Sequence, residues 1–246
     1  MLEMNRQRLN VHILVSIVFS LVYTVYFYVV LKLITEQDML VSNNDITINN
    51  IGIKFIGDFF ATLFVPLILT VIYRKKSADF KLRFMHIYIQ YILLAIMIVL
   101  FFLHGDFTIR GYYKFFFYLV MVSFSEEFIF RGYIYNELQR HNKLLAVIVS
   151  GFFWGILHAI LPGLVAGEGL KLIIVRMLSY ACGGIAAEYY FIYLLEKSKS
   201  LFIPIFVHAI LDYTVGVIGI LTAIGTWAYL FVLDRKNHNT LKPYKS

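Results

Sequence analysis

The sequence predicts an all-α, polytopic membrane protein of about eight transmembrane helices, with the N and C termini in the cytoplasm. Hydrophobic residues make up 60% of the 246 residues and charged residues only 15%, with a mean hydropathy of +0.76. The apolar residues form runs long enough to span a bilayer. The Lys and Arg residues gather in short segments between those runs, as topology signals do. A soluble fold would cover one core with charge, so lipid is the natural solvent for these runs.

Six apolar segments have the length of a spanning helix, and a seventh stretch has room for two. The six segments cover residues 11–33, 51–73, 84–103, 114–138, 144–161 and 171–195. The stretch 201–233 is too long for one upright helix. We therefore expect two short crossings there, joined near Gly216 or Gly219.

The connectors between these segments are alternately rich in Lys and Arg and poor in them, and this alternation predicts which connectors are cytoplasmic. Residues 36–50 contain no Lys or Arg and should face outward, whereas the connector after the second span should be cytoplasmic. The basic residues expected inside are Arg74, Lys75, Lys76, Lys81, Arg83, Arg140, Lys143, Lys197, Lys199, Arg235, Lys236, Lys242 and Lys245. A cytoplasmic C terminus requires an even number of crossings after Lys199, which gives eight. With no repeat and no soluble segment, residues 1–246 are predicted to form a single transmembrane domain.

Composition also excludes several classes of function. The formal net charge is +7, but the basic residues form no single stripe or tail, so nucleic acid is not an expected partner. Cys182 is the only cysteine, which excludes disulfide frameworks and Cys-rich zinc sites. Because it lies in an apolar run, we expect it to be a small buried packing residue.

Three charged residues lie near the middle of the fourth span. Each such charge costs about 2.5–3.5 kcal/mol at a helix centre on insertion scales, so each needs a partner. Glu127 and Arg131 are spaced i,i+4 with the acid first, the better orientation for a helical ion pair. Glu126 lies about 100° around the helix from Glu127 and cannot share that geometry. Glu126 is therefore the unexplained carboxylate.

Two further apolar spans supply ionisable residues that could meet Glu126. His158 lies in one of them, and His208 and Asp212 lie i,i+4 on one face of another. A free Glu, a lone His and a His–Asp pair on separate spans are what a water-activating membrane site needs, and intramembrane ionisable residues are functional candidates by default.

Other charges within the spans have simpler interpretations. Lys54 and Asp58 are spaced i,i+4, which favours a structural salt bridge. Arg176 and Glu188 lie nearer the two ends of the sixth span, from which their side chains can reach the interfaces; the alternative for Glu188 is that it lines the cavity.

These residues resemble the motifs of the CAAX protease and bacteriocin-processing (CPBP, or Abi) family of intramembrane proteases. The first motif, Glu-Glu-xxx-Arg, is intact at Glu126, Glu127 and Arg131. The second, Phe-xxx-His, is met at His158 but has Trp154 in place of Phe. The third, His-xxx-Asn or Asp, is met by His208 and Asp212. The resemblance covers a catalytic core at about residues 115–213, and it implies an all-helical fold of about eight spans.

The resemblance also implies a role for each motif residue. Glu126 would activate water for attack on a scissile carbonyl, with His158 positioning or protonating. Glu127 and Arg131 would hold the site, and the third motif would stabilise the oxyanion. An ionised Asp212 would repel an oxyanion, so it is either protonated or keeps His208 charged as the donor. No cofactor is favoured; zinc bound by Glu126, His158 and His208 is the alternative.

The expected function is therefore hydrolysis of a peptide bond in a membrane-associated or peptide-precursor substrate. The expected partners are a peptide or membrane-protein substrate and the lipid bilayer. The alternatives are a non-catalytic membrane scaffold or bacteriocin-immunity protein, and a proton- or cation-coupled transporter. The composition, rich in Ile, Lys, Asn, Tyr and Phe, hints at an AT-rich genome and hence a bacterial plasma membrane, where bacteriocin or peptide processing is favoured over prenylated substrates.

Overall fold

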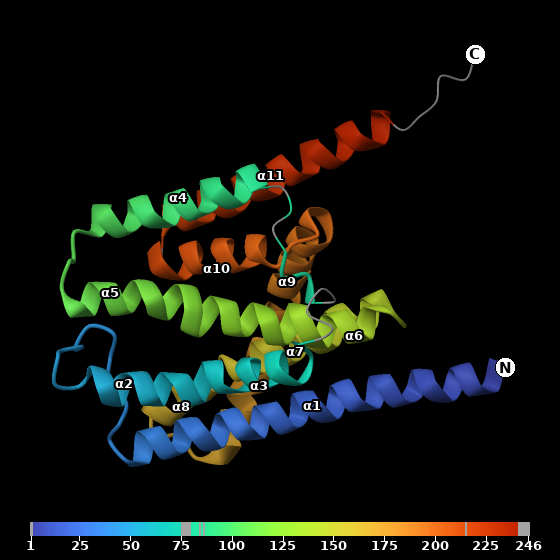
Figure 1. The fold of residues 1–246 in the computed structure, drawn as a ribbon. Coiled ribbons are helices and arrows are strands. Elements are labelled where there is room, and N and C mark those ends of the chain that lie inside the picture. Colours follow the sequence, from blue (N-terminus) through green and yellow to red (C-terminus); the bar gives the residue numbers. More distant parts are fainter. Residues whose placement is uncertain (1, 75–79, 84, 86, 215, 241–246) are drawn as a thin grey trace.

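The protein is all-helical, as the sequence predicts (Figure 1). The computed structural model describes residues 2–74, 80–83, 85, 87–214 and 216–240, and no strand occurs among them. In chain order the helices are α1 (Leu2–Glu36), α2 (Ile51–Asp58), η1 (Phe59–Leu63), α3 (Phe64–Ile72), α4 (Ile87–His104), α5 (Ile109–Phe116), η3 (Phe117–Phe124), η4 (Glu127–Tyr135), α6 (Asn136–Gln139), α7 (Lys143–Leu157), α8 (Ile160–Val165), α9 (Leu170–Ser198), α10 (Phe202–Thr214) and α11 (Val217–Thr240). The predicted division of 201–233 into two helices is confirmed.

Within the described part of the chain, five helical stretches are long and apolar enough to cross a membrane. They are Val11–Glu36, Ile51–Ile72, Lys143–Val165, Leu170–Ser198 and Val217–Lys236, and two shorter apolar helices are Tyr88–His104 and Phe202–Thr214. Many large hydrophobic side chains on these helices face outward, far more than a soluble protein leaves exposed. The chain is a multi-pass membrane protein.

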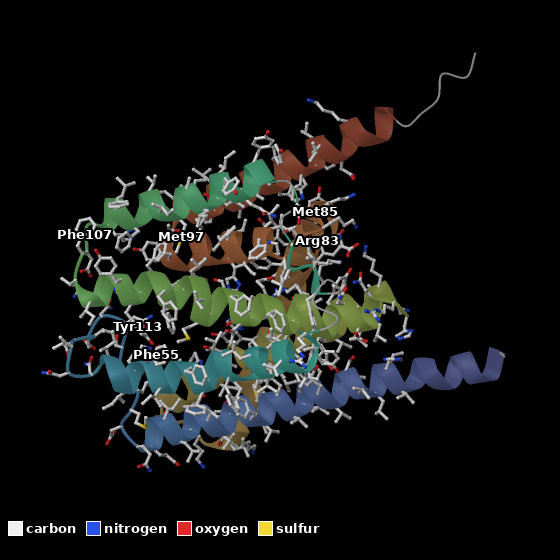
Figure 2. All side chains as sticks on the ribbon, viewed as in Figure 1. Phe55, Arg83, Met85, Met97, Phe107 and Tyr113 are labelled. Carbon is white, nitrogen blue, oxygen red and sulfur yellow. The ribbon has the colours of Figure 1, made fainter. Side chains whose placement is uncertain are left out.

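The helices α1, α4, α5, α10 and α11 run lengthwise, and α1 begins at the same end of the bundle at which α11 ends (Figure 1). The α1–α2 and α4–α5 connections lie at the opposite end. Figure 2 shows Met97, which is fully buried, between α4 and α10, and Tyr113 between α5 and α2. Of the basic residues used to predict orientation, Lys75, Lys76, Lys242 and Lys245 lie outside the described residues.

The helix that carries the glutamate pair runs without a break from 109 to 139, and it changes its winding on the way. Two π-helical stretches, η3 and η4, flank Ser125 and Glu126. A π turn is uncommon, and it is found mostly at functional sites because the extra residue in each turn redirects the side chains. Every residue of η4 is buried, so this stretch forms the centre of the core.

Small residues bring α7 and α9 close together. A Cβ atom on Gly155 would lie 2.7 Å from the Tyr180 carbonyl oxygen and 2.9 Å from the Gly184 Cα, and one on Gly151 would lie 2.7 Å from the Glu188 Cβ. Only glycine permits this approach, which resembles the small-residue contacts of membrane helices. It places the helix that ends before His158 directly against the one that carries Glu188.

Candidate active site

The side chain of Glu126 meets residues from two other helices. Its Oε2 atom accepts a hydrogen bond of 2.6 Å from Trp154 Nε1. The same oxygen lies 3.7 Å from His158 Nε2 and 3.9 Å from His208 Nε2. The carboxylate that had no partner within its own helix therefore lies among the polar groups of α7 and α10, as the sequence predicts.

Each histidine at this centre is oriented by a second contact. His158 Nδ1 lies 2.8 Å from the Trp154 carbonyl oxygen. Because a carbonyl only accepts, Nδ1 carries the proton, and Nε2 of a neutral ring is left as an acceptor facing Glu126. His208 has a carboxylate at each ring nitrogen, with Glu127 Oε1 2.8 Å from Nδ1 and Asp212 Oδ2 3.4 Å from Nε2.

Glu127 and Arg131 belong to a buried charged network that reaches well beyond their own helix. Arg131 Nη1 lies 3.3 Å from Glu127 Oε1, but Nη2 lies closer, at 2.7 Å, to Glu188 Oε2 on α9. Ser150 on α7 donates to the Glu188 carboxylate at 2.8 Å. All three charged side chains are completely buried. The expectation that Glu188 would reach an interface is wrong, because the glycine contact between α7 and α9 draws it into the core.

The other charges of the spans are paired as ordinary ion pairs. Lys54 Nζ lies 2.8 Å from Asp58 Oδ1, which confirms the predicted salt bridge, and Tyr113 donates to the second Asp58 oxygen. Arg176 pairs with Glu168 in the α8–α9 connection, and this bond lowers the pKa of the Glu168 carboxyl. Cys182 is exposed on α9, contrary to the expected burial.

Trp154 is the residue of this site that the sequence did not single out. The indole N–H of Trp154 donates to Glu126. The centroid of the Trp154 ring also lies 4.3 Å from the centroid of the His158 ring. The Arg131 guanidinium carbon lies 4.9 Å from the centroid of the Trp154 ring, within the range of a cation–π contact. The available signal was that Trp replaces the Phe of the second motif, since indole has an N–H donor that phenyl lacks.

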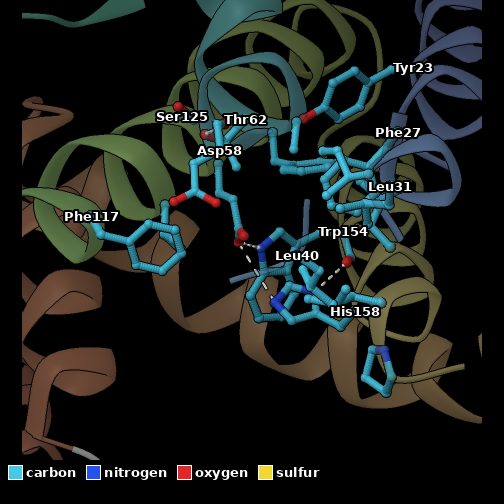
Figure 3. A pocket seen from close by; sticks show the side chains of 18 of the residues that line it. Tyr23, Phe27, Leu31, Leu40, Asp58, Thr62, Phe117, Ser125, Trp154 and His158 are labelled. Carbon is cyan, nitrogen blue, oxygen red and sulfur yellow. Dashed lines mark hydrogen bonds and ion pairs between the residues drawn. The ribbon is translucent and has the colours of Figure 1, made fainter. Parts of the chain in front are cut away.

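A cavity of about 330 Å³ opens beside Glu126 (Figure 3). Its walls come largely from α1 and from the α2–η1 helix, neither of which carries a motif, together with η3, α7 and α8. The lining is mainly apolar, and the polar side chains in it are Lys54, Asp58, Thr62, Ser125, Glu126 and His158. An apolar cavity with a few convergent polar groups is the usual form of a small ligand site.

The residues considered as zinc ligands are Glu126, His158 and His208, and the Glu126 Oε2 atom lies 3.7 Å and 3.9 Å from the two histidine Nε2 atoms. In the described part of the chain, no three His, Cys, Asp or Glu side chains are placed to hold a metal ion together. The Glu126 oxygen nearest both rings already accepts the indole N–H. We therefore derive no step through a metal.

Comparison with known proteins supports the resemblance. Residues 108–214 match the sequence model of the family "Type II CAAX prenyl endopeptidase Rce1-like". No curated protein and no solved structure matches the chain. The matched segment contains Glu126, Trp154, His158, His208 and Asp212, all of which meet at one place in the fold. Over residues 108–214, the chain is therefore similar to the Rce1-like CAAX prenyl endopeptidase family.

Proposed function

We propose that this protein is an intramembrane endopeptidase in which Glu126 activates water. The observation that supports this most directly is the convergence of Glu126, His158 and His208 from three helices around one partly open point. The Glu126 side chain is 23% exposed and the His158 side chain 38%, so a water molecule and a substrate can reach both. Glu127 and Arg131, in contrast, are sealed from any substrate.

In the proposed reaction, water lies beside Glu126 Oε2 and the acceptor Nε2 of His158. Glu126 takes a proton as the water oxygen attacks the scissile carbonyl carbon. The tetrahedral intermediate then collapses, the C–N bond breaks, and the proton on Glu126 passes to the leaving amine. His158 serves to orient the water, since its own proton is held by the Trp154 carbonyl group.

We assign stabilisation of the oxyanion to His208 in its doubly protonated form. Such a ring donates from Nδ1 to Glu127, while Nε2 lies at the centre of the site, where it can donate to the developing oxyanion. Asp212 then acts indirectly, as the counter-ion that keeps the ring protonated, and the positive charge of the ring offsets the repulsion between an ionised Asp212 and the oxyanion. Glu127 and Arg131 hold the ring and the helix in place.

The proposed topology keeps residues 1–246 as a single transmembrane domain with eight crossings and with both termini in the cytoplasm. The α5–α6 run, which carries three charged residues of the site, would be one of the crossings, and α4 and α10 would be two of the shorter ones. The common end of α1 and α11 supports this arrangement (Figure 1). The catalytic core corresponds to about residues 115–213.

For the substrate we propose a peptide precursor or a membrane protein, with an apolar part of it in the 330 Å³ cavity. The proposed location is a bacterial plasma membrane, and the reaction is proposed to need no metal. The test is to compare peptides released by cells that carry the wild type or Glu126→Gln. At least one cleaved product should be present with the wild type and missing with the variant, at equal levels of inserted protein. Identical peptide sets would contradict the proposal.

A further inference from the structure

A second, polar cavity reaches the site from the end of the bundle at which α1 joins α2. It has a volume of about 650 Å³. Its lining comes from the α1–α2 connection, which contributes Ser42, Asn43 and Asn44, and from the first turns of α5. Asp212, at the C-terminal end of α10, lines it as well. The apolar cavity beside Glu126 shares none of these residues.

Asp212 connects this polar cavity to the catalytic centre. Its side chain is 36% exposed and faces the cavity, while its Oδ2 atom lies 3.4 Å from His208 Nε2. The same His208 nitrogen lies 3.9 Å from Glu126 Oε2. The polar cavity therefore ends one side chain away from the carboxylate that is proposed to activate water.

Asn43 provides an independent indication that water occupies this cavity. Its Oδ1 atom is buried and has no hydrogen-bond partner among the described residues, while its Nδ2 atom lies 3.5 Å from Tyr118 Oη. A buried amide oxygen without a partner costs about 1–3 kcal/mol, and ordered water usually supplies the missing bond. A polar cavity of this size readily holds several water molecules.

Another part of the cavity wall comes from the α4–α5 connection, which contributes Asp106. Asp106 accepts hydrogen bonds from Thr108 and Arg110, and these bonds lower the pKa of its carboxyl to about 2. A Cβ atom on Gly111 would lie 1.8 Å from the Asp106 carbonyl oxygen, so only glycine lets this connection lie against α5. The glycine contact and the hydrogen bonds of Asp106 therefore fix the backbone of this part of the wall.

Charge indicates the face of the membrane on which the cavity opens. The α1–α2 connection that forms part of its rim contains no Lys or Arg from residue 37 to residue 50, and α5 contributes two basic residues to the rim, Arg110 and Lys114. The connections at the other end of the bundle carry more basic residues, among them Arg74, Lys81, Arg83, Arg140, Lys143, Lys197 and Lys199. We propose that the polar cavity is the route by which water reaches Glu126, and that it opens on the extracytoplasmic face. This inference rests on the proposed peptidase function, and it adds the side of the membrane from which water enters the site.

The route can be tested by blocking it chemically. In a Cys182→Ser background, Ser42→Cys places a thiol in the rim by a nearly isosteric change, and Asn43→Cys serves as a second variant. A bulky, membrane-impermeant thiol reagent is added to intact cells, and the proteins are then purified. Gly169→Cys, on the same proposed face with open space around it, and His141→Cys, on the opposite face, are the controls.

Modification from outside should lower the kcat of the Ser42→Cys variant at least about tenfold and leave its KM unchanged. The bound reagent excludes water from the polar cavity but leaves the substrate cavity open. Gly169→Cys should be modified without loss of kcat, and His141→Cys only after the membrane is opened. Modification of both rim variants only in opened membranes would overturn the assigned face. Full modification with unchanged kcat, or a rise in KM alone, would overturn the water route. If the wild type shows no peptidase activity, the proposed function fails, while labelling still decides the face.

Discussion

Trp154→Phe removes a single hydrogen bond from the proposed general base and preserves most other contacts. The indole N–H donates to Glu126 Oε2 at 2.6 Å, whereas the Nε2 atoms of His158 and His208 lie 3.7 Å and 3.9 Å from this oxygen. Phenylalanine keeps an aromatic ring next to His158 and beneath Arg131. The substitution therefore frees the Glu126 carboxylate without opening a large cavity.

The magnitude follows from the charge on the acceptor. A hydrogen bond to a charged group contributes about 1.5–3 kcal/mol net. If the bond serves to hold Glu126 at the attacking water, that energy is lost from the transition state, and each 1.36 kcal/mol is a factor of ten in rate. We expect kcat to fall by about ten- to a hundredfold with little change in KM, since Trp154 forms only a small part of the wall of the substrate cavity.

The assay uses purified protein and the peptide identified by comparing wild-type and Glu126→Gln cells. Trp227→Phe is the matched control, because Trp227 stacks on Phe231 within α11, a helix that carries no residue of the site, and its loss should leave kcat unchanged. Thermal unfolding in detergent checks that both variants are folded. If folded Trp154→Phe retains activity within about twofold of the wild type, the indole does not position the base and the reasoning is wrong.

Four further predictions test the rest of the site and the packing that holds it. Glu126→Gln should abolish proteolysis but leave the protein folded and inserted, as measured by peptide release and protease protection; residual cleavage would remove Glu126 from the mechanism. Elemental analysis of active protein should find no stoichiometric zinc; zinc that is lost in His158→Ala would establish a metal site instead. Glu188→Ala should destabilise the protein by about 3–5 kcal/mol in unfolding measurements, because it leaves the buried Arg131 with Glu127 alone, and a near-zero effect would show that the network is not structural. Gly155→Ala should destabilise by about 1–3 kcal/mol by pushing α7 from α9, whereas Gly183→Ala, which meets open space, should not; equal effects would contradict the close helix contact.

The sequence by itself determined that this protein is solvated by lipid, that it is all-helical, and which charged residues within the spans are the candidates for a site. Long apolar runs fix the length of the helices, and a charge within such a run is costly enough to be recognised without a structure. The i,i+4 spacings also identified real neighbours, because a helix places such residues on one face whatever surrounds it: Lys54 pairs with Asp58, and His208 contacts Asp212. The place at which the chain turns between α10 and α11 was predictable for the same reason, since it depends only on the length of the segment.

Only the tertiary structure decided which partner each charged group has. Arg131 lies closer to Glu188, 57 residues further along the chain, than to Glu127 one turn away. Glu126 binds the indole of Trp154, which spacing within one helix cannot reveal. These contacts depend on how each helix is rotated about its axis, and that rotation is set by the π turns around Glu126 and by the glycine contact between α7 and α9. The rotation of a helix about its axis is set by its packing against other helices. Residue spacing within one helix therefore identifies the charged residues but not their partners on other helices.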